Sequence, residues 1–346
     1  MNLKKARSWQ PPENWITIKT IDAHTEGEPL RVILSGLPEL EGKTILERRQ
    51  FMQKHLDHLR KALMWEPRGH ADMYGCVITP PVTEEADFGV LFLHNEGYST
   101  MCGHGIIGVV KVALETGILP IEDAPEQIAI DTPAGLVVAY PRISQGRVES
   151  VAFHNVPSFV LLKDKIVEVP QLGRVTFDVA FGGAFYAFVD ADSLNIELTS
   201  PNYRKLIELG MAIKHAVMEQ FPIEHPFEED LSFLYGTIFT GSPRNANHHS
   251  RHVCIFAEGE VDRSPTGTGV SARLALLYEK GELKVDQTII IESLIDSTFS
   301  GRVVTTTTFG QYPAVIPEVG GRAFITGVQQ FCIDPEDPLK YGFFLR

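Results

Sequence analysis

Two similar segments, one in each half of the chain, constrain the fold more than any other feature of the sequence. CGHGIIGVVKVALETG begins at Cys102, and TGTGVSARLALLYEKG begins at Thr266. Each has the pattern x-Gly-x-Gly at its head, then an apolar helix-like stretch, and then, at matching positions, Gly117 or Gly281. A glycine just after a helix commonly takes the left-handed conformation that ends the helix. The repeat therefore predicts two similar domains, each built around one helix.

The glycine-rich head of each segment predicts a binding site for a carboxylate. The first N–H groups of a helix have no partner within the helix and lie at the positive end of its dipole, so they bind anions without a basic side chain. Glycines at 103, 105, 267 and 269 let the backbone approach such a ligand. The same field is expected to lower the pKa of the Cys102 thiol and make it a thiolate base. The alternative is a buried structural cysteine.

Composition limits the class of partner. The 346 residues are 44% hydrophobic, which is enough for two domains with their own cores. A formal net charge of -13 argues against binding to nucleic acid or to an anionic membrane surface. Neither a signal-peptide pattern nor a run of eighteen apolar residues is visible. We therefore expect a cytoplasmic protein that acts on a small molecule.

Strand-forming segments dominate the rest of the chain. Residues 15–37 predict a strand pair joined by a polar turn. Residues 44–64 open with a capping box at Thr44 and Glu47 and predict one amphipathic helix. A second helix is expected from Ser200, as N-cap, to Val217. Further strands are predicted in residues 86–95, 128–140, 149–162, 175–190, 235–240 and 252–257.

Metal and nucleotide sites are not predicted. The four cysteines lie far apart without a CxxC pair, so neither a zinc site nor a disulfide framework is indicated. His248, His249 and His252 lack carboxylate or thiolate ligands at a suitable spacing, and a solvated loop is the preferred interpretation. The chain has no GxxxxGK[ST] phosphate-binding pattern. No cofactor is therefore expected.

Two motifs, MCGHG at 101–105 and DRSPTGTG at 262–269, resemble the two signature motifs of the proline racemase family. The resemblance covers nearly the whole chain. It includes DAHTEGEP at 22–29, FGGAFYAFVDA at 181–191 and the segment at 300–327.

The resemblance implies an α+β fold, like that of diaminopimelate epimerase, with the active site between two pseudo-symmetric lobes. Each lobe would be a curved β-sheet wrapped around a central α-helix. The first lobe would comprise residues 15–140 and 316–346, and the second would comprise residues 141–315. The resemblance also implies a homodimer.

The residue at position 266 sets the expected reaction. In the family, two cysteines, one heading each motif, stand on opposite faces of the substrate α-carbon, but Thr266 occupies the second place here. A threonine hydroxyl is too weakly acidic to act as that base. The resemblance therefore implies dehydration of trans-3-hydroxy-L-proline to Δ1-pyrroline-2-carboxylate by Cys102. The alternatives are a 4-hydroxyproline epimerase or proline racemase, and a non-catalytic amino-acid-binding protein.

The remaining site residues follow from the same motifs. We expect the substrate carboxylate to bind the N–H groups around Gly103, His104, Gly267 and Thr268. By the family pattern, Asp262 and His104 would contact the ring nitrogen. Asp262 could instead be a turn residue, His104 could satisfy a backbone group, and Thr266 could pack beside the substrate or be a structural N-cap. Phe185 or Tyr186 is a candidate wall for the proline ring. Residues 24–29 form a polar turn that is a candidate border of the cleft, but ordinary turn chemistry explains it nearly as well.

Overall fold

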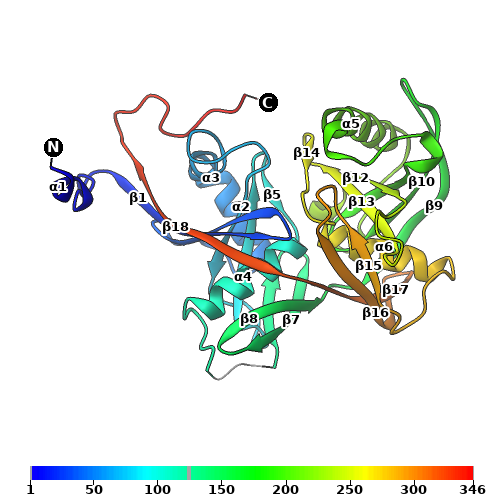
Figure 1. Cartoon of the computed structure of the whole chain (residues 1–346), viewed down its shortest axis with the longest axis horizontal. Coiled ribbons are helices and arrows are strands. Elements are labelled where there is room, and N and C mark those ends of the chain that lie inside the picture. Colours follow the sequence, from blue (N-terminus) through cyan, green and yellow to red (C-terminus); the bar gives the residue numbers. More distant parts are fainter. Residues whose placement is uncertain (1, 123–125, 346) are drawn as a thin grey trace.

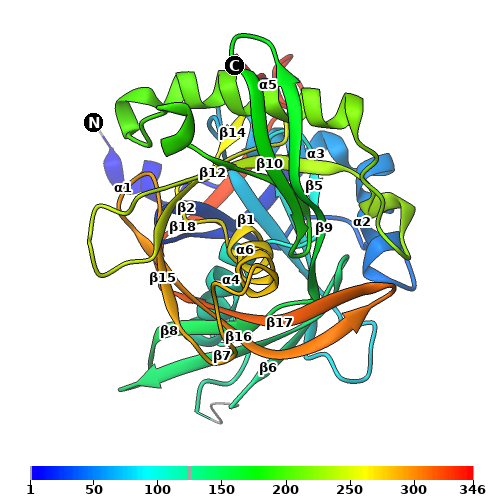
Figure 2. The same ribbon diagram turned by 90° about the vertical axis from the view of Figure 1, so that its right-hand side faces the viewer.

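A computed structural model describes residues 2–122 and 126–345. Two lobes lie side by side, with helix α4 (Gly103–Glu115) inside one and helix α6 (Gly267–Glu279) inside the other (Figure 1). Strands wrap around each of these helices, as the view along α6 shows (Figure 2). The lobes and their central helices confirm the two domains that the repeat predicted and the α+β fold class that the family resemblance implied.

The strands of the first lobe form a closed ring of backbone pairing. Its last strand, β18, pairs with its first strand, β1, and the chain runs directly from β17 into β18. Each strand of the ring pairs with the next, except that β17 continues along the chain into β18 without pairing with it. In this order the strands are β1 (Ile16–Thr25), β2 (Glu28–Ser35), β3 (Tyr74–Thr79), β4 (Phe88–His94), β6 (Ile128–Thr132), β7 (Gly135–Ser144), β8 (Arg147–His154), β17 (Tyr312–Gly321) and β18 (Ala323–Ile333). The short strand β5 (Tyr98–Ser99) pairs with β4.

The second lobe is closed in the same way. Strand β17 also belongs to this ring, because it pairs with β16 along its length and with β9 near its beginning. The other members, in pairing order, are β9 (Ser158–Val169), β10 (Gly173–Phe181), β11 (Phe185–Asp190), β12 (Leu234–Gly241), β13 (Ser250–Phe256), β15 (Ile289–Glu292) and β16 (Thr298–Phe309). Strand β14 (Glu260–Val261) pairs with β13.

The proposed lobe boundaries at residues 140 and 315 stay predictions. Each of them falls inside a strand, the first in β7 and the second in β17. Because β17 pairs with β8 of one ring and with β9 of the other, the backbone ladder continues from lobe to lobe.

The central helices explain the repeat. Almost every residue of α4 and α6 is buried, because each helix is surrounded by the strands of its ring. An apolar surface on all sides is what such a position requires. Both helices end as predicted: Gly117 (φ 77°) and Gly281 (φ 74°) adopt the left-handed conformation just after the last turn.

The outer helices differ from the prediction. Residues 44–64 form two helices, α2 (Ile45–His55) and α3 (Asp57–Met64), because Leu56 leaves the helical conformation. Thr44 caps α2 as expected, accepting a hydrogen bond from the Glu47 N–H at 3.1 Å. The second predicted helix, α5 (Tyr203–Gln220), begins three residues late, after the 3₁₀ turn η2 (Ser200–Asn202). Short elements complete the fold: α1 (Leu3–Arg7), η1 (Asp192–Leu194) and η3 (Glu229–Leu231).

Three segments that were each predicted as one strand form two strands in the structure. Residues 128–140, 149–162 and 175–190 are divided by turns into β6 and β7, β8 and β9, and β10 and β11. The predicted pair within 15–37 and the predicted strands at 86–95, 235–240 and 252–257 are confirmed by β1 and β2, β4, β12 and β13.

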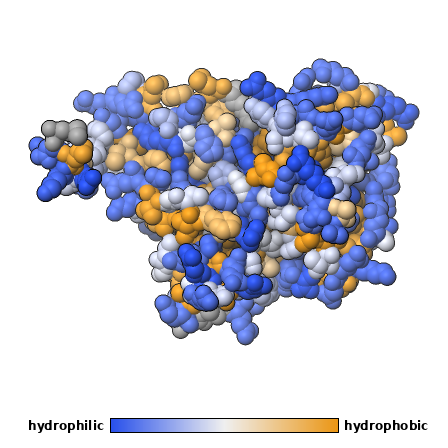
Figure 3. Space-filling view, viewed as in Figure 1, coloured by the Kyte–Doolittle hydropathy of each residue, from blue (hydrophilic) through white to orange (hydrophobic). Residues whose placement is uncertain are grey.

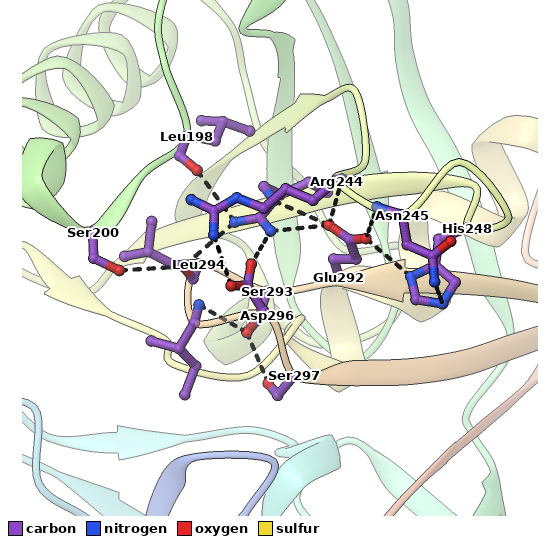
Figure 4. Close-up of polar contacts among 12 residues, drawn as sticks. Leu198, Ser200, Arg244, Asn245, His248, Glu292, Ser293, Leu294, Asp296 and Ser297 are labelled. Carbon is purple, nitrogen blue, oxygen red and sulfur yellow. Dashed lines mark hydrogen bonds and ion pairs between the residues drawn. The ribbon is translucent and has the colours of Figure 1, made fainter.

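A buried ion-pair network fixes the turn between β15 and β16 (Figure 4). The guanidinium of Arg251, only 2% exposed, binds Glu292 with N···O distances of 3.0 and 3.2 Å, and it also contacts Asp296. Glu292 accepts further hydrogen bonds from the N–H groups of Arg244 and Asn245. The turn carries Ile295, which packs so closely on Gly27 of the other lobe that a methyl group there would overlap it.

We expect Arg251→Ala to lower the free energy of unfolding by about 3–5 kcal/mol, because it leaves the Glu292 carboxylate buried without its cation. Urea denaturation measures the change. The matched control is Arg244→Ala, whose side chain is 56% exposed and pairs with Asp296 at 2.7 Å; its expected cost is about 0–1 kcal/mol. Equal losses in the two variants would contradict this interpretation.

One face of the molecule is mostly polar. On the face shown in Figure 3, hydrophilic residues cover most of both lobes and hydrophobic residues occur in separate groups among them. Within the described residues, no helix is long and apolar enough to span a membrane.

Candidate active site

Cys102 stands at the start of α4 with its side chain turned back over the helix. Its backbone is extended (φ -144°, ψ 107°), and its Sγ accepts a hydrogen bond from the Gly105 N–H at 3.2 Å. The Nδ1 atom of His104 lies 3.2 Å from the same sulfur. The thiol therefore takes the place of the usual N-cap oxygen.

Thr266 occupies the equivalent position before α6 but has a different conformation. Its backbone is left-handed (φ 68°, ψ 98°), and its side chain makes no capping hydrogen bond. The interpretation of Thr266 as a structural N-cap is therefore wrong. A β-branched residue with positive φ is uncommon and strained, and such residues concentrate at functional sites.

The two helix starts touch each other. A methyl group added to Gly103 would lie 2.6 Å from the Cα of Gly267, and one added to Gly267 would lie 2.6 Å from the Cα of Gly103. Only glycine permits this approach, because any larger side chain would collide with backbone. The contact brings the free N–H groups of two helices to one place.

A small pocket lies at this contact, between the lobes. Its volume is about 20 Å³, which is close to the space that one water molecule needs. An amino acid as large as proline does not fit into this volume, so its binding requires the pocket to widen. The lining contains all seven predicted site residues, namely Cys102, Gly103, His104, Asp262, Thr266, Gly267 and Thr268.

The sequence model of the family described as proline racemase matches residues 20–344. The chain belongs to the proline racemase family. It is 49% identical over 345 residues to a protein of Colwellia psychrerythraea named trans-3-hydroxy-L-proline dehydratase, an alignment that covers 99% of this chain and 97% of the relative. It is 47% identical over 335 residues to a human protein of the same name, with 95% of each chain covered.

The fold of this proline racemase family member is also similar to a crystal structure. A hydroxyproline epimerase from Agrobacterium vitis with bound trans-4-OH-L-proline has a TM-score of 0.89 and is 31% identical. The similarity covers 95% of this chain and 96% of that chain.

The electrostatics at Cys102 differ from the expectation. Burial raises the pKa of the Cys102 thiol well above its ordinary value, although hydrogen bonds from Tyr74 and the Gly105 N–H act in the opposite direction. The prediction that the helix start lowers this pKa is therefore wrong in its net direction, because loss of water outweighs the helix. A thiol of high pKa is a stronger base once it has lost its proton.

Burial shifts the pKa values of Asp262 and His104 in opposite directions. Burial raises the pKa of Asp262 to about 6, against hydrogen bonds from Ser264, whose N–H lies 2.7 Å from Oδ1. Burial lowers the pKa of His104 to about 3. At neutral pH, the pocket of this family member thus holds one carboxylate and a neutral imidazole.

Several residues of the pocket were not predicted. Tyr186, one of two candidate walls, lines it and bonds to the Thr268 Oγ1 at 2.7 Å, whereas Phe185 packs among aromatic rings elsewhere. The lining residues that were not predicted are Tyr74, Met101, Tyr235 and Phe256. Met101 belongs to the MCGHG motif, whereas no local pattern marks the other three, since each lies in an apolar strand.

The turn at 24–29 does more than connect two strands. Thr25 donates a hydrogen bond to the carbonyl of His104 at 2.8 Å. Glu28 is fully buried and accepts the N–H of Arg263, in the second lobe, at 2.7 Å. The turn thereby contacts both motif segments in addition to connecting β1 and β2.

The histidine cluster is not a solvated loop throughout. His252 lies in β13 and is fully buried, so that interpretation is wrong for this residue. His248 pairs with Glu292 at 3.0 Å. The described part of the chain contains no group of three or more His, Cys, Asp or Glu side chains able to hold a metal ion.

Proposed function

We propose that this protein removes water from trans-3-hydroxy-L-proline and yields Δ1-pyrroline-2-carboxylate. The observation that carries the proposal is a single thiol, Cys102, in a pocket whose second motif presents Thr266. Relatives that are 47–49% identical over nearly the whole chain and carry the dehydratase name support it. The epimerase structure is more distant, at 31% identity.

The substrate carboxylate would bind between the two helix starts. The N–H groups of Gly103, His104, Gly267 and Thr268 belong to the first turns of α4 and α6, where helical partners are absent. Both helix dipoles point their positive ends at this position. The same donors stabilise the negative charge that moves onto the carboxylate when the α-proton leaves.

Cys102 would then carry the proton between two bonds of the substrate. The thiolate takes the α-proton, the Cα–H electrons form a double bond to C3, and the C3–O bond breaks. In the trans-3-hydroxy isomer, the α-hydrogen and the hydroxyl lie on the same ring face, so the new thiol can protonate the departing hydroxide. The resulting enamine tautomerises to the cyclic imine. No base is required on the Thr266 face, which a hydroxyl group can line.

Asp262 would bind the ring nitrogen, because a carboxylate pairs well with a secondary ammonium. We expect Asp262→Asn to raise KM about 10- to 100-fold, because the variant loses one hydrogen bond between charged groups. In the parent protein, kcat/KM should fall as pH decreases through about 6, where Asp262 becomes protonated. A pH profile of imine formation measures both effects. A low-pH decline that persists unchanged in Asp262→Asn would contradict this role.

The proposed reaction is tested with purified protein and trans-3-hydroxy-L-proline, without added cofactor. Imine formation is followed by the coloured product with aminobenzaldehyde, and we expect it to stop when Cys102 is alkylated. If no imine forms, optical rotation with 4-hydroxyproline and proline distinguishes the rival functions. A change in rotation would support an epimerase or racemase, and no change would support a non-catalytic binding protein.

Location, assembly and the absence of a cofactor stay predictions. A cytoplasmic homodimer is expected from the sequence and from the family, and light scattering after gel filtration measures the mass of the particle. Activity that survives exhaustive dialysis against a chelator would support catalysis without a metal.

A further inference from the structure

The Cys102 thiolate must form without a cation beside it. The groups that face the sulfur are His104 on α4, Tyr74 on β3, the Gly105 N–H and, further away, the carboxylates of Asp262 and Glu28. The two carboxylates make the thiolate less stable, and His104 is neutral. Among these neighbours, the Tyr74 hydroxyl and the Gly105 N–H are the groups that lower the pKa of the thiol.

Tyr74 is the first of three linked hydroxyl groups. Its side chain lines the pocket with Cys102, and its hydroxyl is hydrogen-bonded to the Ser99 Oγ. The Ser99 Oγ is in turn 2.7 Å from the hydroxyl of Tyr235. All three side chains belong to buried residues, with exposed fractions of 3% for Tyr74, 2% for Ser99 and 8% for Tyr235.

Only one arrangement of the hydroxyl protons in this chain lets it donate a hydrogen bond to the thiolate. Each hydroxyl donates a single hydrogen bond. If Tyr74 donates to the sulfur, Ser99 donates to Tyr74 and Tyr235 donates to Ser99. The three dipoles then point the same way, and each bond polarises the next. Such a chain stabilises a negative sulfur without placing a positive charge next to the substrate nitrogen.

The chain also crosses from one lobe to the other. Tyr74 in β3 and Ser99 in β5 belong to the first lobe, whereas Tyr235 in β12 belongs to the second. A substrate needs a pocket wider than about 20 Å³, and a movement of the lobes apart would supply the space. Such a movement would separate Ser99 from Tyr235, and closure would restore their hydrogen bond.

We propose that Tyr74, Ser99 and Tyr235 act as positioning residues that stabilise the Cys102 thiolate, and that the chain is complete only when the lobes are closed. The inference rests on the proposed use of Cys102 as the base. Its consequence is that the Cys102 thiolate is most stable when the lobes are closed, which is also the state that protects the carbanion-like intermediate from water.

The test is a direct titration of Cys102. The protein is labelled with ¹³C at the cysteine Cβ, and the Cys102 resonance is assigned by its absence in Cys102→Ser. Its chemical shift is followed from pH 7 to 11 in the parent chain and in the variants Tyr74→Phe and Tyr235→Phe. The matched control is Tyr98→Phe, next to Ser99, whose hydroxyl bonds to Asp57 at 3.2 Å instead.

We expect the titration curve to move to higher pH by about 1–2 units in Tyr74→Phe, as for loss of a hydrogen bond to a charged group. A smaller shift in the same direction is expected in Tyr235→Phe, and none in Tyr98→Phe. If a tyrosine variant fails to fold, Ser99→Ala interrupts the same chain and should also move the Cys102 titration curve to higher pH.

Three results would overturn the proposal. They are an unchanged curve in both chain variants, a shift in Tyr74→Phe alone, and a Cys102 that stays a thiol up to pH 11 in the parent chain. The titration needs no substrate, because the chain from Tyr74 to Tyr235 is already complete in this structure, so it is independent of the dehydratase assay. Imine formation with unchanged curves would contradict the chain alone, whereas shifted curves without imine formation would contradict the reaction alone.

Discussion

Cys102→Ser should lower kcat for imine formation by about a thousandfold or more, within the range that general acid–base groups contribute. Serine keeps the shape of the side chain, but its hydroxyl is far too weak an acid to supply a base at the pH of the assay. Binding should survive, because the carboxylate is held by backbone N–H groups that the substitution does not touch. Calorimetric titration with proline measures that binding alongside the imine assay.

The matched control is Cys332→Ser, which changes a half-buried thiol in β18, outside the pocket. It should retain the parent activity. Full activity in Cys102→Ser would remove the proposed mechanism. Loss of both activity and proline binding in that variant would show instead that the thiol is needed to build the site.

Gly267→Ala should lower kcat/KM by about a hundredfold, although it removes no reacting group. The new methyl group would lie 2.6 Å from the Cα of Gly103, so the two helix starts must separate by roughly 1 Å to restore an ordinary contact. A displacement of that size at the reacting atoms costs about this factor. The imine assay measures the effect, and thermal unfolding reports whether the lobes remain folded.

The control for steric specificity is Gly97→Ala. A methyl group at Gly97 meets no atom within 4 Å, and its backbone does not need positive φ. Parent activity is expected there. An active Gly267→Ala enzyme would mean that the close approach of the two helices is not required for catalysis.

Features encoded within a short segment could be predicted from the sequence. The two central helices, their terminal glycines and the residues at their heads are all contained in two stretches of about sixteen residues. The apolar character of those stretches indicates burial, and Gly117 and Gly281 indicate where each helix ends. For the same reason, the motif residues could be assigned to one pocket before the structure was known.

Features that depend on contacts between distant segments could not be predicted. Tyr74, Ser99 and Tyr235 meet only because β3, β5 and β12 come together across the lobes. The net rise in the Cys102 pKa also has no local sign, since it reflects burial by the whole fold. The strained backbone of Thr266 also could not be predicted from the sequence, because threonine rarely adopts positive φ.

Strand β17, which completes both rings, determines when the protein can fold during its synthesis. Domains of many proteins fold in turn as they leave the ribosome, the first one before the second is made. Here, the first ring closes only when β18 pairs with β1, and the second closes only when β17 pairs with β9. Neither ring can therefore close until residues 312–333 have emerged from the ribosome. Nearly the entire nascent chain must therefore remain open, with unpaired strand edges exposed. A ribosome-bound chain stalled before residue 312 should be cleaved readily by protease in both halves.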